Sequence, residues 1–124
     1  MTKLAVSILV RHLGQALADA ARAAEFGAEL VEYRIDQVGE DADLVVALVE
    51  GSPLPCILTC RPVWEGGFYE GDDAQRFELL GHAFKGVRAP AYLDLELAAY
   101  QRHPDVLERI GIAGQMGQAA GTGL

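Results

Sequence analysis

Charged and apolar side chains alternate in the stretch AELVEYRID, residues 28–36. In an extended strand every second side chain points to the same face, so Glu32, Arg34 and Asp36 share one face. Burying such charges is costly unless they are paired or hydrated. Carboxylate and guanidinium groups on one face can hydrogen-bond a small, hydroxylated, anionic ligand. The stretch therefore predicts a strand whose polar face lines a ligand site.

Two later stretches, 54–61 and 91–97, repeat this arrangement, with leucines and cysteines on their opposite faces. In parallel α/β folds, ligands bind at the carboxyl ends of the strands, so three polar strand ends predict one shared site. Solvated loop starts or structural ion pairs are the alternative interpretation, which the repetition over three strands disfavours. The polar positions of the two stretches are Thr59, Arg61, Asp94 and Glu96.

The elements that carry these residues alternate between strand and helix along the chain. Apolar spacing predicts helices that follow each strand, with Asp72 or Asp73 as the N-cap of the third. Four consecutive strand–helix units predict a parallel α/β sheet. The predicted strands are 4–10, 28–36, 54–60 and 91–97, and the predicted helices are 14–25, 41–50, 72–85 and 98–110, the last interrupted near Pro104.

The last fourteen residues, 111–124, differ in composition from the rest of the chain. Five of them are glycine and none is charged, which is typical of a flexible tail. The glycine spacing does not match the dinucleotide-binding motif. We therefore expect one folded unit over residues 1–110, followed by a flexible tail over 111–124.

Composition excludes several classes of protein. The 124 residues suffice for one domain, and the net charge of −8 disfavours nucleic acid and anionic membranes as partners. The apolar run 4–10 is too short for a membrane helix and lacks the features of a signal peptide, so we expect a cytoplasmic protein. Cys56 and Cys60, about 13 Å apart on one strand, are too far apart for a disulfide. Scattered histidines and these cysteines predict no metal site.

A longer motif, TCRPVWEGGFYEGDDAQR, begins at Thr59. Together with EYRID and YLDLEL it resembles type I 3-dehydroquinate dehydratase, especially the forms fused to shikimate dehydrogenase. The resemblance covers about residues 4–100 and implies a (β/α)8 TIM barrel, of which this chain holds the N-terminal half in four βα units. It implies conversion of 3-dehydroquinate to 3-dehydroshikimate and water in the shikimate pathway. The family uses a lysine Schiff base and a histidine base, with no metal or diffusible cofactor.

The same resemblance implies roles for five residues of this sequence. Glu32 and Arg34 would hold the hydroxyls of the substrate, and Arg61 would bind another of its polar oxygens. Glu65 would orient the catalytic histidine, and Ser7 would be a further substrate contact. Asp36, Asp94 and Glu96 fit the family pattern, and we interpret them as residues that support the substrate contacts or have a structural role.

The sequence departs from the family in length and in its reactive residues. A complete barrel needs about 250 residues, and the family places its histidine after the fourth strand and its lysine on a later strand. No lysine or histidine of this chain occupies those positions, so we expect a truncated chain that is inactive alone. The residues concerned are Lys3, Lys85, His12, His82 and His103, and we expect the three histidines to be ordinary surface or capping residues.

Two other functions stay open. A half barrel could be a non-catalytic module for ligand binding or assembly, because its first and last strands have open edges. Through these edges it could form a homodimer or bind a complementing C-terminal half. A different small α/β enzyme would instead need Glu65 or Glu32 as a base without a lysine. That function ranks last, because no nucleophile is placed near either glutamate.

Overall fold

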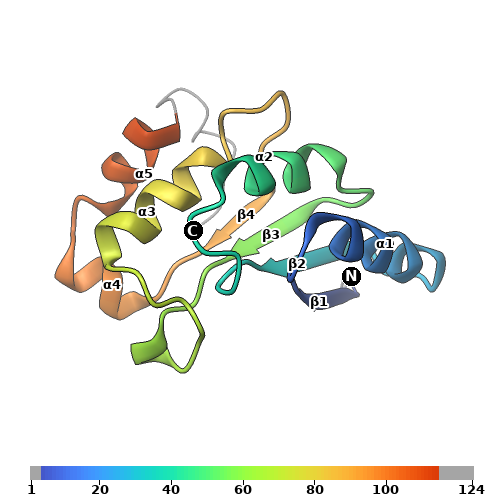
Figure 1. Cartoon of the computed structure of the whole chain (residues 1–124), viewed down its shortest axis with the longest axis horizontal. Helices are drawn as coiled ribbons and strands as arrows, with labels where there is room; N and C mark the ends of the chain where they lie inside the picture. The colour runs from blue at the N-terminus through green and yellow to red at the C-terminus, as the bar shows by residue number, and fades with distance from the viewer. Residues whose placement is uncertain (1–3, 115–124) are drawn as a thin grey trace.

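A computed structural model describes residues 4–114 of the chain (Figure 1). Its four strands form a single parallel sheet in the order β1-β2-β3-β4, which confirms the predicted α/β fold. The hydrogen-bonded strands are shorter than the predicted apolar stretches. Their bounds are β1 (Ala5–Leu9), β2 (Leu30–Arg34), β3 (Cys56–Thr59) and β4 (Tyr92–Asp94).

The helices α1, α2 and α3 follow one another along one face of the sheet (Figure 1). Crossovers between parallel strands are right-handed, so strands that pair in chain order place their connecting helices on the same face. The opposite face of the sheet therefore stays free of α1, α2 and α3. The helices are α1 (Leu13–Glu25), α2 (Ala42–Gly51), α3 (Asp73–His82), α4 (Leu97–Arg102) and α5 (Val106–Gly114), with a short 3-10 helix, η1 (Val63–Glu65).

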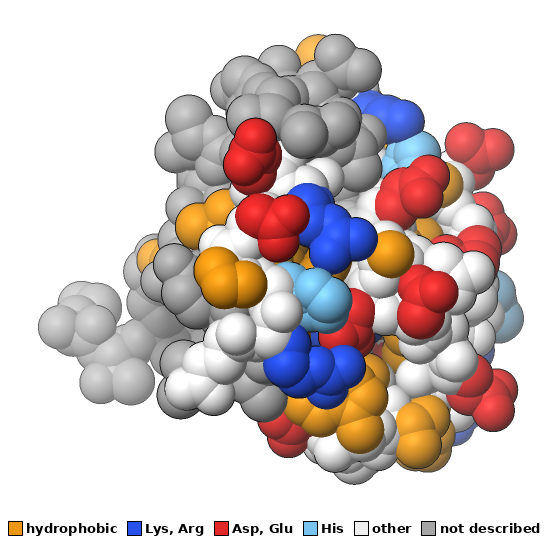
Figure 2. Space-filling model, turned by 90° about the vertical axis from the view of Figure 1, so that its left-hand side faces the viewer, with side chains coloured by type: hydrophobic (Ala, Val, Ile, Leu, Met, Phe, Trp, Pro, Cys, Tyr) orange, Lys and Arg blue, Asp and Glu red, His pale blue; other side chains and the backbone are white. Residues whose placement is uncertain are grey.

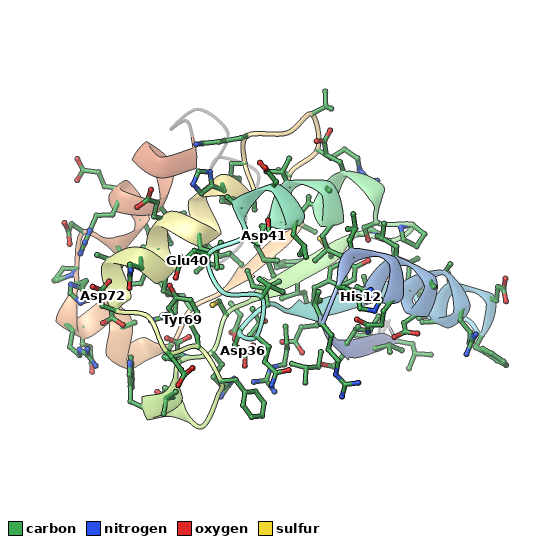
Figure 3. All side chains as sticks on the ribbon, viewed as in Figure 1. His12, Asp36, Glu40, Asp41, Tyr69 and Asp72 are labelled. Carbon is green, nitrogen blue, oxygen red and sulfur yellow. The ribbon has the colours of Figure 1, made fainter. Side chains whose placement is uncertain are left out.

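Side-chain caps fix where the first three helices begin. Asp72 accepts a hydrogen bond from the Gln75 backbone N–H at 2.8 Å, which confirms the predicted N-cap of α3. Asp41 caps α2 in the same way, and His12 Nδ1 caps α1. Figure 3 labels the three capping residues. Each cap satisfies a helix N–H that has no partner within the helix, and such a cap typically contributes about 1 kcal/mol.

The hydrophobic core lies between the sheet and its covering helices. Val31, Tyr33 and Leu58 on this face of β2 and β3 are fully buried. Cys56 and Cys60 are buried on the same face and are not bonded to each other, as predicted. Burial raises the pKa of the Cys56 thiol to about 11 and raises the pKa of Cys60 as well.

The end of the described chain differs in part from the prediction. Helical structure is interrupted around Pro104 as expected, between α4 and α5. However, α5 continues to Gly114, so the expected boundary at residue 110 falls inside a helix. Val106 and Ile110 are buried, and packing of α5 against α3 stabilises this helix. The expected tail over 115–124 lies outside the described residues. No helix within 4–114 is long and apolar enough to cross a membrane.

Candidate functional site

The strand register brings the predicted polar residues onto one face of the sheet. Ser7 of β1 pairs with Glu32 of β2, and Arg34 of β2 pairs with Thr59 of β3. Thr59 pairs in turn with Asp94 of β4. Since side chains alternate along each strand, these residues all lie on the face opposite the buried core residues. The predicted convergence of polar strand ends is therefore present in the fold.

Glu32 is held by hydroxyl groups on both sides. Ser7 Oγ donates to Glu32 Oε1 at 2.6 Å, and Thr59 Oγ1 donates to Oε2 at 2.7 Å. The two bonds fix the carboxylate across β1, β2 and β3. The sequence placed Thr59 on this face but did not identify it as a partner of Glu32, because only the register shows which residues lie side by side.

Arg34 is held by a carboxylate two residues further along the chain. Its Nη2 lies 2.6 Å from Asp36 Oδ2, and the Asp36 side chain is completely buried. The backbone N–H of Phe68 donates to the same Asp36 oxygen at 3.1 Å. The Arg34 guanidinium also lies 5.9 Å from the centre of the Phe68 ring. About a quarter of the Arg34 side chain (26%) stays exposed and can reach a ligand.

Arg61 follows β3 and is held more loosely. Its Nη2 lies 3.8 Å from Asp94 Oδ2, and both side chains are about 40% exposed (41% and 42%). Exposed pairs of this kind contribute at most about 1 kcal/mol, so Arg61 is free to exchange Asp94 for a ligand.

Glu65 lies at the end of η1 and is half-buried. Within residues 4–114 its side chain forms no hydrogen bond or ion pair. The structure thus links Ser7, Glu32 and Arg34 into the sheet, whereas Glu65 is carried by the loop alone.

A buried group of charges lies between α3, α4 and the end of β4, and the sequence did not predict it. Arg76 is completely buried, and its Nη1 lies 2.8 Å from Glu96 Oε1 and 3.1 Å from the Cys60 carbonyl oxygen. Asp73 pairs with Arg76 at 3.4 Å and with Arg102 at 2.9 Å. Figure 2 shows basic, histidine and acidic side chains gathered on the face that carries α4 and α5. Arg76 thereby connects α3 to the ends of β3 and β4.

The two buried carboxylates of this group differ in their pKa. Burial raises the pKa of Glu96; Arg76 lowers it without reversing the rise, and repulsion by the Asp94 carboxylate adds to the rise. Burial acts to raise the pKa of Asp73 as well, but the charges of Arg76 and Arg102 lower this pKa by more. Hydrogen bonds from Arg76 and His103 lower it further. The pKa of Asp73 is therefore lowered.

A cavity of about 650 Å³ opens between the loops that follow β1, β2 and β3. Asp36 and Phe68 line it, together with polar residues, but the five predicted site residues do not. Ser7, Glu32 and Arg34 lie on the sheet face opposite the core, whereas Arg61 follows β3 and Glu65 lies in η1. The other lining residues are Arg11, Gln37, Gly39, Glu40, Val63, Gly67, Tyr69, Glu70 and Gly71.

The polar face can orient a small hydroxylated anion, and its described part offers no amine nucleophile. Lys85, the one lysine within 4–114, lies beyond the end of α3 and is exposed. The described residues also contain no group of histidine, cysteine and carboxylate side chains that could hold a metal ion. His12 caps α1, which fits the expected capping role, and His82 is the last residue of α3. His103 differs from the expectation, because its Nε2 lies 3.0 Å from Asp73 Oδ2 in the buried group of charges.

Comparison with known proteins gives consistent matches. The family model for type I 3-dehydroquinase matches residues 4–113. A 3-dehydroquinate dehydratase of Desulfotalea psychrophila is 40% identical over 96 residues, which cover 77% of this chain and 39% of that protein. A bifunctional 3-dehydroquinate dehydratase/shikimate dehydrogenase of Arabidopsis thaliana is 35% identical over 92 residues, covering 73% of this chain and 15% of that protein.

Solved structures match the fold in the same way. The 3-dehydroquinate dehydratase of Enterococcus faecalis superimposes with a TM-score of 0.73 at 28% identity, over 90% of this chain and 50% of that one. The enzyme of Geobacillus kaustophilus, at 20% identity and a TM-score of 0.75, shares the fold. The chain therefore spans about half, or less, of the length of the proteins it matches, and the four βα units correspond to half of a TIM barrel.

Proposed function

The chain belongs to the type I 3-dehydroquinase family, and from this membership we infer that its polar sheet face is the substrate-orienting half of a 3-dehydroquinate dehydratase site. The reaction would convert 3-dehydroquinate to 3-dehydroshikimate and water, a step of the shikimate pathway. The arrangement of Glu32 is the observation that carries this inference. Its carboxylate is fixed by Ser7 and Thr59. Glu32 lies two residues before Arg34, on the same face of β2.

The substrate is a ring with several hydroxyls, a ketone and a carboxylate, and the polar face supplies matching partners. Glu32 accepts from a hydroxyl, and Arg34 donates to a hydroxyl oxygen. Arg61 binds a further polar oxygen once it leaves Asp94, to which it is weakly paired. Ser7 contacts the substrate or holds Glu32 in place. An anionic substrate favours arginines that are partly exposed, as Arg34 and Arg61 are.

The bond-making steps need groups that the described polar face does not hold. In the proposed mechanism a lysine forms a Schiff base with the ketone, and a histidine oriented by Glu65 removes the neighbouring proton. The half-buried Glu65 forms no contact within 4–114 that would prevent such a role. We therefore expect these 124 residues to bind 3-dehydroquinate without turning it over.

Calorimetric titration with 3-dehydroquinate tests the binding role. Glu32→Gln keeps the shape of the side chain but removes its charge, and we expect its Kd to rise about tenfold, equivalent to about 1.4 kcal/mol. Glu29→Gln, at an exposed position next to β2, is the matched control and should leave the Kd unchanged. Equal affinities of the wild type and Glu32→Gln would contradict the assignment.

Turnover is tested by the ultraviolet absorbance of the conjugated enone product. We expect no absorbance change with the 124-residue chain. Turnover that borohydride abolishes in the presence of substrate would identify Lys85 or Lys3 as the Schiff-base residue. Turnover that survives borohydride would show that the chemistry proceeds without a Schiff base.

A second proposed function is assembly through the open edges of the sheet. Within the described residues, β1 and β4 each pair with one neighbour only, so each offers backbone donors and acceptors to another strand. A second copy could pair there, or a complementing C-terminal half. Sedimentation of the purified chain distinguishes the outcomes: a stable compact dimer supports homodimeric assembly, and a monomer contradicts it.

A further inference from the structure

One oxygen of Asp36 joins two parts of the candidate site. Asp36 Oδ2 pairs with Arg34 Nη2 at 2.6 Å and accepts the Phe68 backbone N–H at 3.1 Å. Arg34 belongs to β2, whereas Phe68 belongs to the loop between β3 and α3. The Asp36 side chain is completely buried, so water does not compete for these bonds.

The loop that carries Phe68 is a closed unit rather than an open segment. The Tyr69 N–H donates to the Arg61 carbonyl oxygen at 3.1 Å, and the Val63 N–H donates back to the Tyr69 carbonyl oxygen at 3.1 Å. Gly67 packs so closely that a Cβ there would lie 2.1 Å from the Arg61 carbonyl oxygen. The position of Phe68 is therefore tied to that of Arg61.

A second contact fixes this loop to the segment that follows β2. The Tyr69 hydroxyl donates to the carboxylate of Glu40, and Figure 3 shows the two side chains directed toward each other. Tyr69 is buried, and burial together with the Glu40 carboxylate raises its pKa, so the phenol keeps its proton. Asp36 and Glu40 thus hold the same loop at two neighbouring points.

We propose that Asp36 is a positioning residue that fixes Arg34 and the β3–α3 loop as one unit, so that Arg34 and Arg61 are presented to a ligand together. The part of this inference that concerns ligand binding rests on the proposed function. Without the Asp36 charge, the Phe68 ring is the remaining partner of the Arg34 guanidinium among residues 4–114. Its side chain can then leave the orientation in which it meets the ligand.

Asp36→Asn tests the proposal, because the amide keeps an acceptor for Phe68 N–H but loses the charge that holds Arg34. The control is Asp41→Asn, the same chemical change at the N-cap of α2, which contributes to stability and not to the position of Arg34. Each ¹⁵N-labelled variant is measured for hydrogen exchange of Arg34 Nε–H and of the Phe68 amide. Calorimetry gives the Kd for 3-dehydroquinate, and urea unfolding gives the stability.

We expect Asp36→Asn to accelerate exchange at Arg34 Nε–H and to raise the Kd about tenfold, the loss typical of one charge-assisted hydrogen bond. Asp41→Asn should lower the stability and change neither the exchange rate of Arg34 Nε–H nor the Kd. Phe68→Leu is a second variant that keeps the backbone bond. Because Asp36 still pairs with Arg34, it should leave both Arg34 Nε–H and the amide of residue 68 protected.

The outcomes separate this proposal from the proposed function. If the wild-type chain fails to bind 3-dehydroquinate, the proposed function fails for this chain, and the exchange signals still decide the role of Asp36. If Asp36→Asn leaves both exchange rates at wild-type values, or changes them no more than Asp41→Asn does, the positioning role is overturned. Should Asp36→Asn not fold, loss of protection at Arg34 Nε–H in Phe68→Leu, where Asp36 is intact, overturns the proposed clamping of the guanidinium by Asp36.

Discussion

Replacing Arg76 by methionine should destabilise the fold severely, because it leaves a buried carboxylate without its cation. Arg76 is completely buried and ion-paired with Glu96, whose side chain is only 6% exposed. Removing one partner of a buried pair costs about 3–5 kcal/mol. Asp73 keeps Arg102 and His103, so most of the loss arises at Glu96. Since domains of this size are stable by about 5–15 kcal/mol, Arg76→Met should remove a large share of the stability.

The double variant Arg76→Met/Glu96→Gln separates the buried charge from the lost packing. Neutralising Glu96 removes the unpaired charge, so we expect the double variant to recover about 2 kcal/mol relative to Arg76→Met. Urea unfolding at pH 7 followed by circular dichroism measures all three variants, with Glu96→Gln alone completing the cycle. The assay needs no substrate.

The pH dependence of the single variant provides a further check. In the wild type the folded-state pKa of Glu96 is raised by burial, so its unfavourable effect develops as the pH rises through that pKa. Loss of Arg76 raises this pKa further, and the deficit of Arg76→Met should shrink as the pH is lowered. A cost below about 1 kcal/mol at pH 7, or no recovery in the double variant, would refute the reasoning.

Three further predictions concern other contacts of the described residues. Asp73→Asn should destabilise at pH 7, and the difference from wild type should fade in acid. Arg76 and Arg102 lower the folded-state pKa of Asp73. The contribution of Asp73 to stability is therefore present above the ordinary aspartate pKa and is lost as the pH falls through the folded-state pKa. Urea unfolding at pH 7 and pH 3 measures the difference in stability between Asp73→Asn and wild type, and a difference that stays constant would contradict the prediction. Cys56 should resist a thiol reagent at pH 8 until the chain unfolds, because its pKa is about 11 and it is buried; labelling faster than unfolding would disprove this. Gly67→Ala should distort the β3–α3 loop, since the added Cβ would lie 2.1 Å from the Arg61 carbonyl oxygen; amide shifts unchanged around residues 61–71 would contradict the close approach.

Much of the fold could be predicted from the sequence because local signals agreed with one another. Apolar runs, alternating polarity and capping residues such as Asp72 marked the four strand–helix units before their arrangement was known. The parity of β2 placed Glu32 and Arg34 on one face, and the register confirmed that face. The end of α5 was not predicted, because its packing against α3 outweighs the glycine-rich composition that follows residue 110.

The contacts that organise the site depend on distances between segments far apart in the chain. Thr59 becomes a partner of Glu32 only through the register of β2 and β3. The bond from Phe68 to Asp36 joins residues 32 positions apart, and nothing in either local pattern indicates it. Arg76 is the last residue of the motif that begins at Thr59, and its place in the sequence does not show that it connects the ends of two strands. Sequence parity predicts which face a side chain occupies, and the fold determines its partners.

The central claim is that the polar face of the sheet binds 3-dehydroquinate through Glu32 and Arg34. Chemical-shift mapping of the ¹⁵N-labelled chain during titration with 3-dehydroquinate tests it most directly, because each strand reports separately. We predict shifts concentrated at Ser7, Glu32, Arg34 and Thr59, at the Arg34 side-chain Nε–H, and weaker changes elsewhere. Shifts confined to the cavity lined by Arg11 and neighbouring loop residues, or no shifts at all, would contradict the claim.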